Sequence, residues 1–525
     1  MTGATLLVAL AAPAVVTAHQ LTGRFVSPIP LGAYLVGAVV AVAASFALVL
    51  GRPGAPVRPY PEPTRSRTVG VGDPIARGLA AIGLVGWAWV VIQAVVLGGH
   101  SEGDVASLFL WVYGWVGLAV TCAFVGPAWE YLDPFGTLHR LLAGGLRALG
   151  LAGAPPAPYP ARLGRWPAAI GLAFFVWLEL AVPAARSGQV LGLIMLGYTV
   201  LTLIAMAQYG RTAWRRNGEV FSVWFGLIGR LAPLALPEEP SAERPDRLAV
   251  RRFASGLLAA ERDLASLVLV AFAVAGILYD GLSQTQVFFD AFGAPGVGIQ
   301  TLLLGAWLAL IGLAAYAVGR LVGIPALVAG LVPIAVGYLV AHYLSYLLFD
   351  GQRIAYALTD PLGLGWDLLG LADFEPATDW LPGGVAWSVA LMAVVGGHIL
   401  GAWAGHSVAL REAARGRGPL GGLDARALRA RQVPLAGIMV ALTALTLWSL
   451  GQAIVATPAE PAATGPRSVP AGTHSASERT SDNRSRTAGS SASAAATAVS
   501  IAVRQRIPSA VAASRISAAS RTAPD

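Results

Sequence analysis

The chain has 525 residues, of which 56% are hydrophobic and 12% are charged, and its mean hydropathy is +0.65. A water-soluble domain of this composition would have too little polar surface to cover itself, so the composition excludes a soluble globular protein and predicts a polytopic protein of the lipid bilayer. The formal net charge of +8 comes from arginine without any lysine. Because the arginines follow the predicted membrane topology, we do not assign them to nucleic-acid binding. Cys122 is the single cysteine, which excludes an intrachain disulfide and a cysteine-based zinc or iron–sulfur site.

The two ends of the chain differ from its middle. Residues 1–18 are apolar and end in Val-Thr-Ala, a small-residue pattern typical of signal-peptidase cleavage, although no basic residue precedes the apolar run. Two interpretations stay open, a cleaved signal peptide and a retained first span. We expect a polytopic membrane domain over 19–456. The Ala/Ser/Thr/Arg-rich tail over 457–525 lacks apolar periodicity and is predicted to be disordered.

The middle of the chain predicts an all-α fold, a polytopic transmembrane helical bundle of about ten helices. Each predicted span is a long apolar stretch, and the spans are expected at 31–50, 78–98, 105–126, 167–185, 189–209, 264–280, 297–317, 325–349, 383–410 and 432–455. The apolar segment 220–236 is shorter and is interrupted by Arg230 and Pro233. It is therefore predicted to be an interfacial or re-entrant piece.

The arginines provide an independent test of this layout. If residue 19 lies outside, 25 of the 36 arginines fall in inward-facing loops and 3 fall in outward-facing loops, the rest lying in the C-terminal tail. Cytoplasmic loops of membrane proteins carry such an excess of basic residues. The sequence therefore predicts a multi-pass protein of the cell (plasma) membrane whose mature N-terminus lies outside.

The predicted span 325–349 carries a histidine, His342, within a nearly unbroken apolar run. On a helical period of 3.6 residues, Tyr338, His342, Ser345 and Tyr346 share one face and form a polar stripe inside the membrane. The imidazole is a candidate ligand for a transition metal or haem, or a part of a proton path. The alternative is a core histidine that is hydrogen-bonded to a neighbouring helix.

Two more histidines lie on the next predicted span. His398 and His406 are eight residues apart, so they point in different directions and cannot easily bind one ion together. The predicted orientation brings His398 near mid-depth, where it could meet His342. Gly397, Gly401 and Gly405 form a small-residue ridge on the same span, which permits close packing of another helix.

His19 is a third candidate metal ligand. Cleavage after Ala18 would make His19 the mature N-terminus, where its α-amine and imidazole could together bind an ion of the Cu(II) type. The metal candidates are therefore His342, His398 and His19, and the alternative for His19 is an ordinary exposed histidine.

The predicted outward loop 350–380 is acidic. Its acidic residues outnumber its one arginine, Arg353, and they are Asp350, Asp360, Asp367, Asp373, Glu375 and Asp379. Such a loop could concentrate cations at an entrance formed by Asp350, Tyr338 and Tyr346 next to His342. The alternative is a solvated loop that merely excludes arginine. The stretch 362–374 is expected to form an amphipathic interfacial helix anchored by Trp366.

Several segments resemble a family of bacterial polytopic membrane proteins, many of which carry the automatic label fenitrothion hydrolase. The resemblance spans most of residues 18–410. It rests on AHQLTGRFVSPIPLGAYLVGAVVAVAASFALVL, WVYGWVGLAVTCAFVGPAWEYLDPFGTLHRLL, ILYDGLSQT, VPIAVGYLVAHYLSYLLFDGQR and GHILGAWAGHSVAL, in this order. It implies hydrolysis of an organophosphate ester, without a catalytic motif that can be carried over. The matching histidines are His19, His342, His398 and His406.

These observations leave three hypotheses. The first is a transporter or metal-handling protein with an intramembrane histidine site and a small-molecule or ion substrate. The second is a membrane-embedded hydrolase that uses a histidine-bound metal to activate water, as the resemblance implies. The third is a membrane scaffold or assembly factor. Intramembrane polar residues indicate a site, so the first hypothesis ranks ahead.

Overall fold

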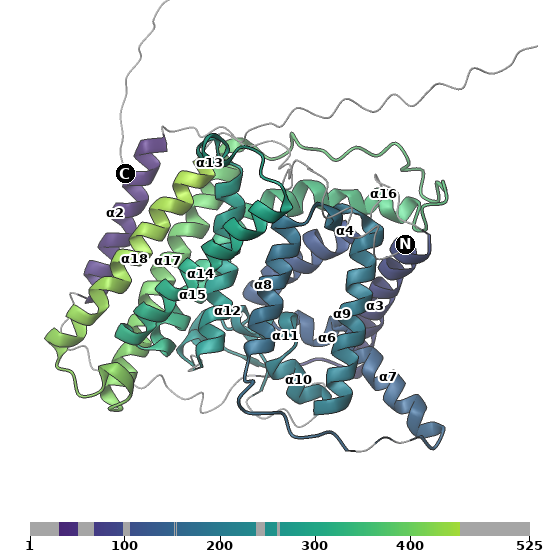
Figure 1. Ribbon diagram of the computed structural model, residues 1–525, viewed down its shortest axis with the longest axis horizontal. Coiled ribbons are helices and arrows are strands. Elements are labelled where there is room, and N and C mark those ends of the chain that lie inside the picture. Colours follow the sequence, from purple (N-terminus) through teal and green to yellow (C-terminus); the bar gives the residue numbers. More distant parts are fainter. Residues whose placement is uncertain are drawn as a thin grey trace, which may run out of the picture. The chain divides into compact units, whose positions relative to one another are not determined.

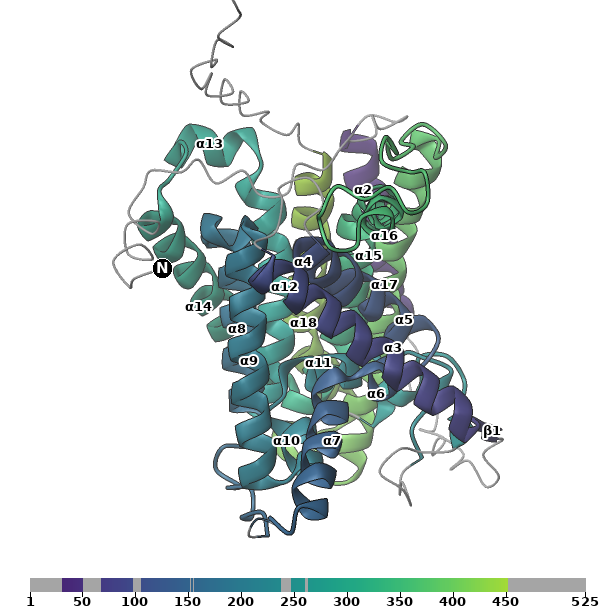
Figure 2. The ribbon, with the colours of Figure 1, turned by 90° about the vertical axis from the view of Figure 1, so that its right-hand side faces the viewer.

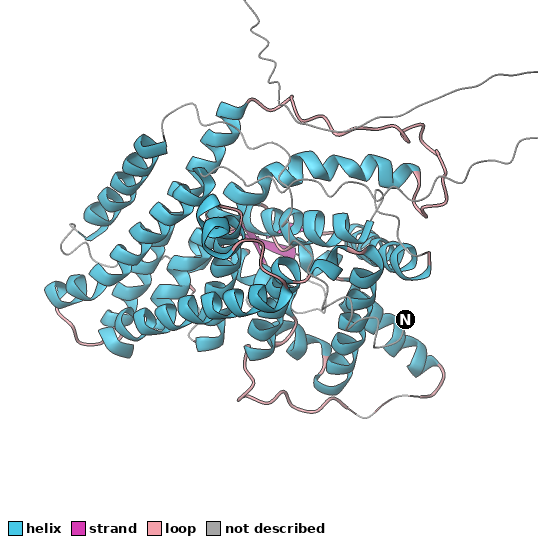
Figure 3. Ribbon diagram, turned by 45° about the horizontal axis from the view of Figure 1, so that its top comes forward, coloured by secondary structure: helices cyan, strands magenta, loops and turns pink. Residues whose placement is uncertain are grey.

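A computed structural model describes residues 31–50, 68–97, 105–151, 153, 155–237, 247–259 and 263–451. Within these ranges the fold is an all-α helical bundle with one small sheet (Figure 3). The predicted signal peptide, His19 and the predicted tail lie outside the described residues.

Every predicted span coincides with a helix. The longer helices are α2 (Leu31–Leu50), α3 (Asp73–Val91), α7 (Pro134–Ala148), α8 (Trp166–Ala181), α9 (Gly188–Tyr209), α12 (Leu264–Ser283), α14 (Val297–Val322), α15 (Ile324–Phe349), α17 (Gly383–Ala414) and α18 (Ala425–Gly451). A further span combines α4 (Val105–Ser107), the π-helix η2 (Leu108–Gly117) and α5 (Leu118–Phe124), and α3 continues into the π-helix η1 (Ile92–Val96).

Short helices and strands connect these spans. The helices are α6 (Ala128–Leu132), η3 (Pro183–Arg186), α10 (Arg211–Asn217), α11 (Val220–Ile228), η4 (Ser255–Leu258), α13 (Gln286–Phe292), η5 (Asp350–Arg353), α16 (Ile354–Thr359) and η6 (Gly418–Leu420). The strands β1 (Thr68–Gly70), β2 (Leu234–Ala235) and β3 (Arg247–Val250) form an antiparallel sheet in the order β1-β3-β2.

Eight helices among the described residues are long and apolar enough to cross a membrane, which identifies an integral, multi-pass membrane protein. The two other predicted spans also form helices: α2 has 20 residues and α8 has 16. Since a bilayer-crossing helix usually has about 20 residues, α8 is short for a span.

The helices differ in how much apolar surface they expose. Helices α12 and α15 are mostly buried, whereas α14 exposes large apolar side chains such as Leu302 and Leu313. In a bilayer, such side chains can face lipid. Figures 1 and 2 show α15 beside α17 and α12, and α2 beside α18. The buried helices α12 and α15 are therefore the elements that can hold a polar site away from lipid.

The glycine ridge of α17 packs against α15, as predicted from its spacing. A Cβ atom added at Gly397 would lie 2.6 Å from the Pro333 carbonyl oxygen, and one at Gly401 would lie 2.5 Å from the Gly330 carbonyl oxygen. Only a residue without a side chain permits this approach of two backbones. The close packing fixes α15, and with it His342, against α17.

The predicted amphipathic helix at 362–374 is wrong. The structure has turns and bends over this stretch, with positive φ at Gly363, Gly365 and Gly370. A left-handed backbone conformation interrupts a right-handed helix, so the local glycines outweigh the apolar pattern. The Asp360 carboxylate accepts the backbone N–H groups of Leu364 (2.9 Å) and Gly365 (2.8 Å), which closes this loop.

The segment predicted to be interfacial or re-entrant contains α11, a buried helix of nine residues. Its side chains Val223, Trp224 and Ile228 are almost completely buried, and the helix packs against α5 and α8. It therefore packs within the bundle and does not lie flat on its surface.

Candidate functional site

The polar stripe predicted on 325–349 leads to a buried cluster. Tyr338 and His342 are each 2% exposed, and Tyr346 is half-buried. Residues four apart on a helix lie above one another, so these three side chains follow one line along α15. The groups that face this line come from α8, α12 and α18.

The Asp280 carboxyl group of α12 is the centre of the cluster. Its Oδ2 atom lies 2.8 Å from Nε2 of His342 and accepts a hydrogen bond of 3.0 Å from the Tyr343 hydroxyl. Its Oδ1 atom accepts a hydrogen bond of 2.9 Å from the Gln284 amide. Asp280 is 1% exposed, so this carboxyl group is held by protein partners within an apolar bundle.

A second carboxyl group, Glu179 of α8, lies near the first. It is within hydrogen-bonding reach of the Tyr343 side chain and interacts electrostatically with Asp280. Because like charges in a medium of low dielectric repel strongly, the two carboxyl groups disfavour simultaneous ionisation. The pair therefore favours a bound proton or another cation.

The His342 ring has one nitrogen engaged and one without a partner. Nε2 faces Asp280, whereas Nδ1 is buried and has no hydrogen-bond partner among the described residues. An ionised carboxylate can only accept a hydrogen bond, so opposite an ionised Asp280 the ring proton is assigned to Nε2 and Nδ1 carries a lone pair. Nδ1 is then available to accept a proton.

His398 has a similar arrangement elsewhere in the bundle. Its Nδ1 atom donates to the Val394 carbonyl oxygen at 2.8 Å, since a carbonyl only accepts, and its buried Nε2 atom has no hydrogen-bond partner in the described ranges. Nδ1 of His406 lies 2.6 Å from Oε1 of Gln432. Across the same ranges, no hydrogen bond links His342 to His398, although the sequence allowed them to meet.

The predicted metal site is not tested by these contacts. In the part of the chain that the structure describes, no three His, Cys, Asp or Glu side chains form a group suited to a metal ion. His19 lies outside that part. Binding of a transition metal or haem by His342, His398 or His19 therefore stays a prediction.

The residues of the predicted cation entrance are spread along α15: Asp350 and Tyr346 lie at its C-terminal end, whereas Tyr338 lies buried within the helix beside His342. Asp350 is half-buried, and its Oδ1 atom is 3.5 Å from Nε of Arg353, so its charge is partly neutralised. Tyr346 interacts electrostatically with Asp350 on one side and with Glu179 and Asp280 on the other. Tyr346 is therefore close enough to both ends of this stretch to feel the charges of Asp350 and of the buried carboxyl groups.

A separate ionic network surrounds Arg215 outside the spans. Its guanidinium group makes two hydrogen bonds to Glu130, of 2.7 and 3.0 Å, and its Nε atom lies 2.8 Å from Oδ2 of Asp133. Burial lowers the pKa of Arg215, but the charges of Asp133 and Glu130 outweigh this effect and raise its pKa above the ordinary value. Glu219 also interacts electrostatically with Arg215. Asp133 caps the N-terminus of α7 and Glu219 caps that of α11, so the network around Arg215 joins helices that are far apart in sequence.

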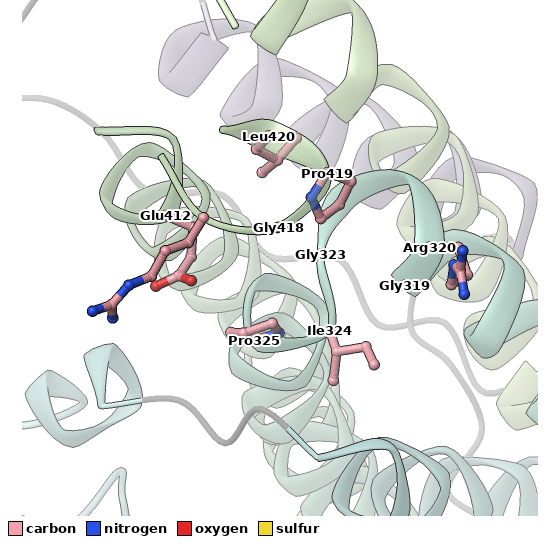
Figure 4. Close-up of a pocket in the computed structure, with 10 residues that line it drawn as sticks. Gly319, Arg320, Gly323, Ile324, Pro325, Glu412, Gly418, Pro419 and Leu420 are labelled. Carbon is pink, nitrogen blue, oxygen red and sulfur yellow. The ribbon is translucent and has the colours of Figure 1, made fainter. Parts of the chain in front are cut away.

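A pocket of about 460 Å³ lies at the junction of α14, α15, α17 and η6 (Figure 4). It is lined mainly by small and apolar residues, together with Arg320, Arg417 and Glu412. None of the residues of the Asp280 cluster lines this pocket, and its charges are mixed in sign. We therefore do not assign it to the candidate site.

No protein-family model matches the chain, and neither a curated protein nor a solved structure matches it. The resemblance to proteins labelled fenitrothion hydrolase therefore stays an expectation from the sequence. The assignment of the candidate site therefore depends on the contacts of the buried Asp280 cluster alone.

The sequence analysis missed Asp280, Glu179 and Tyr343. Two of them are acidic residues within apolar stretches, and that signal alone marks a candidate functional position. Asp280 was placed at the last residue of its predicted span, where a charge is unexceptional. The structure continues α12 to Ser283, which leaves Asp280 inside the helix.

Proposed function

We propose that the protein is a membrane transporter whose buried cluster of Asp280, His342, Tyr343 and Glu179 binds and releases a proton. One observation carries this proposal. The Asp280 carboxyl group is 1% exposed and is hydrogen-bonded to an imidazole and a phenol within a bundle of apolar helices. Ionisable groups are costly to bury in a membrane protein, and they commonly belong to proton relays and ion pathways.

The charges of the cluster support a proton as the bound cation. Two ionised carboxyl groups, Asp280 and Glu179, would place two negative charges in the cluster. His342, which is hydrogen-bonded to Asp280, can take up a proton and neutralise one of these charges. The other titratable side chains around it are the phenols of Tyr338, Tyr343 and Tyr346. The cluster can therefore exchange protons between an imidazole and two carboxyl groups without any side chain leaving the bundle.

The acidic loop supports access from one side of the membrane. Tyr346 interacts electrostatically with both Asp350 and Glu179, and with Tyr338 and His342 it shares one face of α15. Negative charge near an entrance raises the local concentration of cations. We therefore propose that Asp350, Tyr346 and Tyr338 form the cation entrance expected from the sequence.

Proton flux into liposomes that contain the purified full chain and a trapped pH-sensitive dye tests the proposal. A potassium diffusion potential drives the flux, and Asp280→Asn is expected to reduce it to the level of protein-free liposomes. Asp290→Asn is the matched control, because Asp290 is an exposed acid of α13 outside the cluster. Infrared difference spectra should also show a carboxyl group that titrates in the wild type and is lost in Asp280→Asn. Equal behaviour of the wild type and Asp280→Asn in both measurements would refute the proposal.

We also propose ten spans in the cell membrane with the mature N-terminus outside, which the arginine distribution supports. Cys122 is buried, so cysteines introduced by Asp373→Cys and Arg417→Cys can be labelled separately in cells. An impermeant thiol reagent is expected to label the cysteine at position 373 alone. Labelling of the cysteine at position 417 alone would contradict the proposed orientation and indicate the opposite one.

Hydrolysis of an organophosphate ester and a scaffold role remain alternatives from the sequence. Phosphotriester hydrolysis by purified protein across a series of divalent metals tests the hydrolase. Co-purification of a stable partner protein would favour the scaffold.

A further inference from the structure

The pocket shown in Figure 4 lies where two membrane spans meet at their ends. Helices α14 and α15 are both long and apolar enough to cross a bilayer, and only Gly323 separates them in the chain. The C-terminal end of α17, another such helix, forms a further wall. The ends of spans lie at the boundary between hydrocarbon and water, so this cavity of about 460 Å³ lies at the depth of lipid headgroups.

The outer face of α14 leads to a charged residue of this pocket. Leu302, Leu313 and Arg320 are separated by close to whole numbers of helical turns, so they share one face of α14. The two leucines are 73% and 67% exposed, and Arg320 is exposed as well. A lipid whose acyl chains lie along this apolar face therefore brings its headgroup to Arg320.

The end of α17 adds a carboxyl group and a second arginine. The chain leaves α17 through Gly416, which has a positive φ of 65°, and the Arg417 backbone N–H donates to the Glu412 carbonyl oxygen at 2.9 Å. This is the hydrogen bond of a Schellman motif, and it brings Arg417 back beside the last turn of α17. Glu412 is 7% exposed and lines the pocket, and in Figure 4 it lies on the opposite side of the labelled residues from Arg320.

We infer that this pocket binds the headgroup of phosphatidylethanolamine. The phosphate of this lipid is negative and its amine is positive, so the headgroup matches a pocket that holds both arginine and glutamate. Guanidinium groups suit phosphate, and a carboxylate accepts hydrogen bonds from an ammonium group. Phosphatidylglycerol has the same phosphate but no cation for Glu412. The inference does not rest on the proposed proton site, because none of the residues of the Asp280 cluster lines the pocket.

Native mass spectrometry of the purified full chain in mild detergent tests the inference. The probes are phosphatidylethanolamine and phosphatidylglycerol with identical acyl chains, and the wild type is expected to bind the first more tightly. Glycerophosphoethanolamine, which is the same headgroup without acyl chains, should bind far more weakly because it lacks the contact with α14. Equal or tighter binding of phosphatidylglycerol, or equal binding of the headgroup alone, would overturn the inference.

Arg320→Gln and Arg417→Gln each remove a charged donor to the phosphate. Each is expected to weaken binding of phosphatidylethanolamine about fivefold or more. Arg415→Gln is the matched control, because Arg415 is an exposed arginine at the same end of α17 and does not line the pocket. It should bind the lipid as the wild type does. Unchanged binding in both pocket variants, or the same loss in Arg415→Gln, would count against the site.

Glu412→Gln tests the amine side of the pocket. It removes the negative charge with little change in size, so the variant should still bind phospholipid but lose the preference for phosphatidylethanolamine over phosphatidylglycerol. A folded Glu412→Gln protein that keeps the wild-type preference would overturn the match to the amine. Glu412 is buried, so its neutralisation can also impair folding. The exposed Arg320 then decides the matter, because Arg320→Gln leaves the packed residues of the bundle unchanged.

Discussion

The ion pairs of Arg215 allow a prediction of stability that is independent of transport. The side chains of Arg215, Glu130 and Asp133 are 10%, 19% and 4% exposed, so three charges share a nearly dry site. Arg215→Gln leaves Asp133 with the backbone N–H groups of Phe135 and Gly136 but without the guanidinium group that lies 2.8 Å from it. Breaking a buried pair on one side costs about 3–5 kcal/mol. Because Glu130 can still reach water, we expect a loss of about 3 kcal/mol at neutral pH.

This loss should depend on pH. Burial raises the pKa of Asp133, and the Arg215 charge opposes that rise. A carboxyl group whose pKa is higher in the folded state than in the unfolded state stabilises the fold below its unfolded pKa, and this contribution is lost as the pH rises through the folded pKa. Arg215→Gln removes the opposing charge, so the folded pKa of Asp133 rises further. The destabilisation should therefore shrink as the pH falls from neutral into the range where Asp133 is protonated.

Denaturant unfolding in mild detergent, followed by tryptophan fluorescence at about pH 7 and about pH 5, measures both effects. Arg216→Gln is the control, because Arg216 is the exposed neighbour of Arg215 and carries the same charge. Equal stability of the two variants at neutral pH would refute the reasoning, and so would a loss in Arg215→Gln that grows toward acid pH.

Two further predictions concern packing and the acidic loop. Gly397→Ala forces a methyl against the Pro333 carbonyl and should destabilise the fold by about 1–3 kcal/mol. The control is Gly396→Ala, whose added methyl has no atom within 4 Å and should not change the stability. Equal denaturation midpoints of the two variants would contradict the packing of α15 on α17. Trp89→Phe removes the closer of two donors to the Pro361 carbonyl, the indole N–H at 2.5 Å, and leaves the Gln93 amide at 3.4 Å. The change should speed amide exchange in the following loop. Trp87→Phe, whose indole N–H has no partner in the described ranges, is its control, and equal exchange in both variants would argue against this anchor.

The sequence alone determined the class of the protein and the positions of its long apolar helices. A long apolar segment satisfies its backbone hydrogen bonds within itself, so its length and composition predict a helix without knowledge of its neighbours. The polar stripe of α15 and the glycine ridge of α17 follow from helical spacing in the same way. The turns at 362–374 are also determined locally, because the left-handed conformations of Gly363, Gly365 and Gly370 outweigh the apolar pattern.

Only the tertiary structure decided what the stripe faces. Asp280 and His342 are 62 residues apart, and Glu179 lies on a third helix, so no periodicity within one span predicts their contact. Which helix faces meet depends on side-chain packing between spans, such as the close approach of α15 to α17 at Gly397 and Gly401. The sequence thus predicted an intramembrane histidine, and the packing of the helices made it part of a carboxyl–imidazole site.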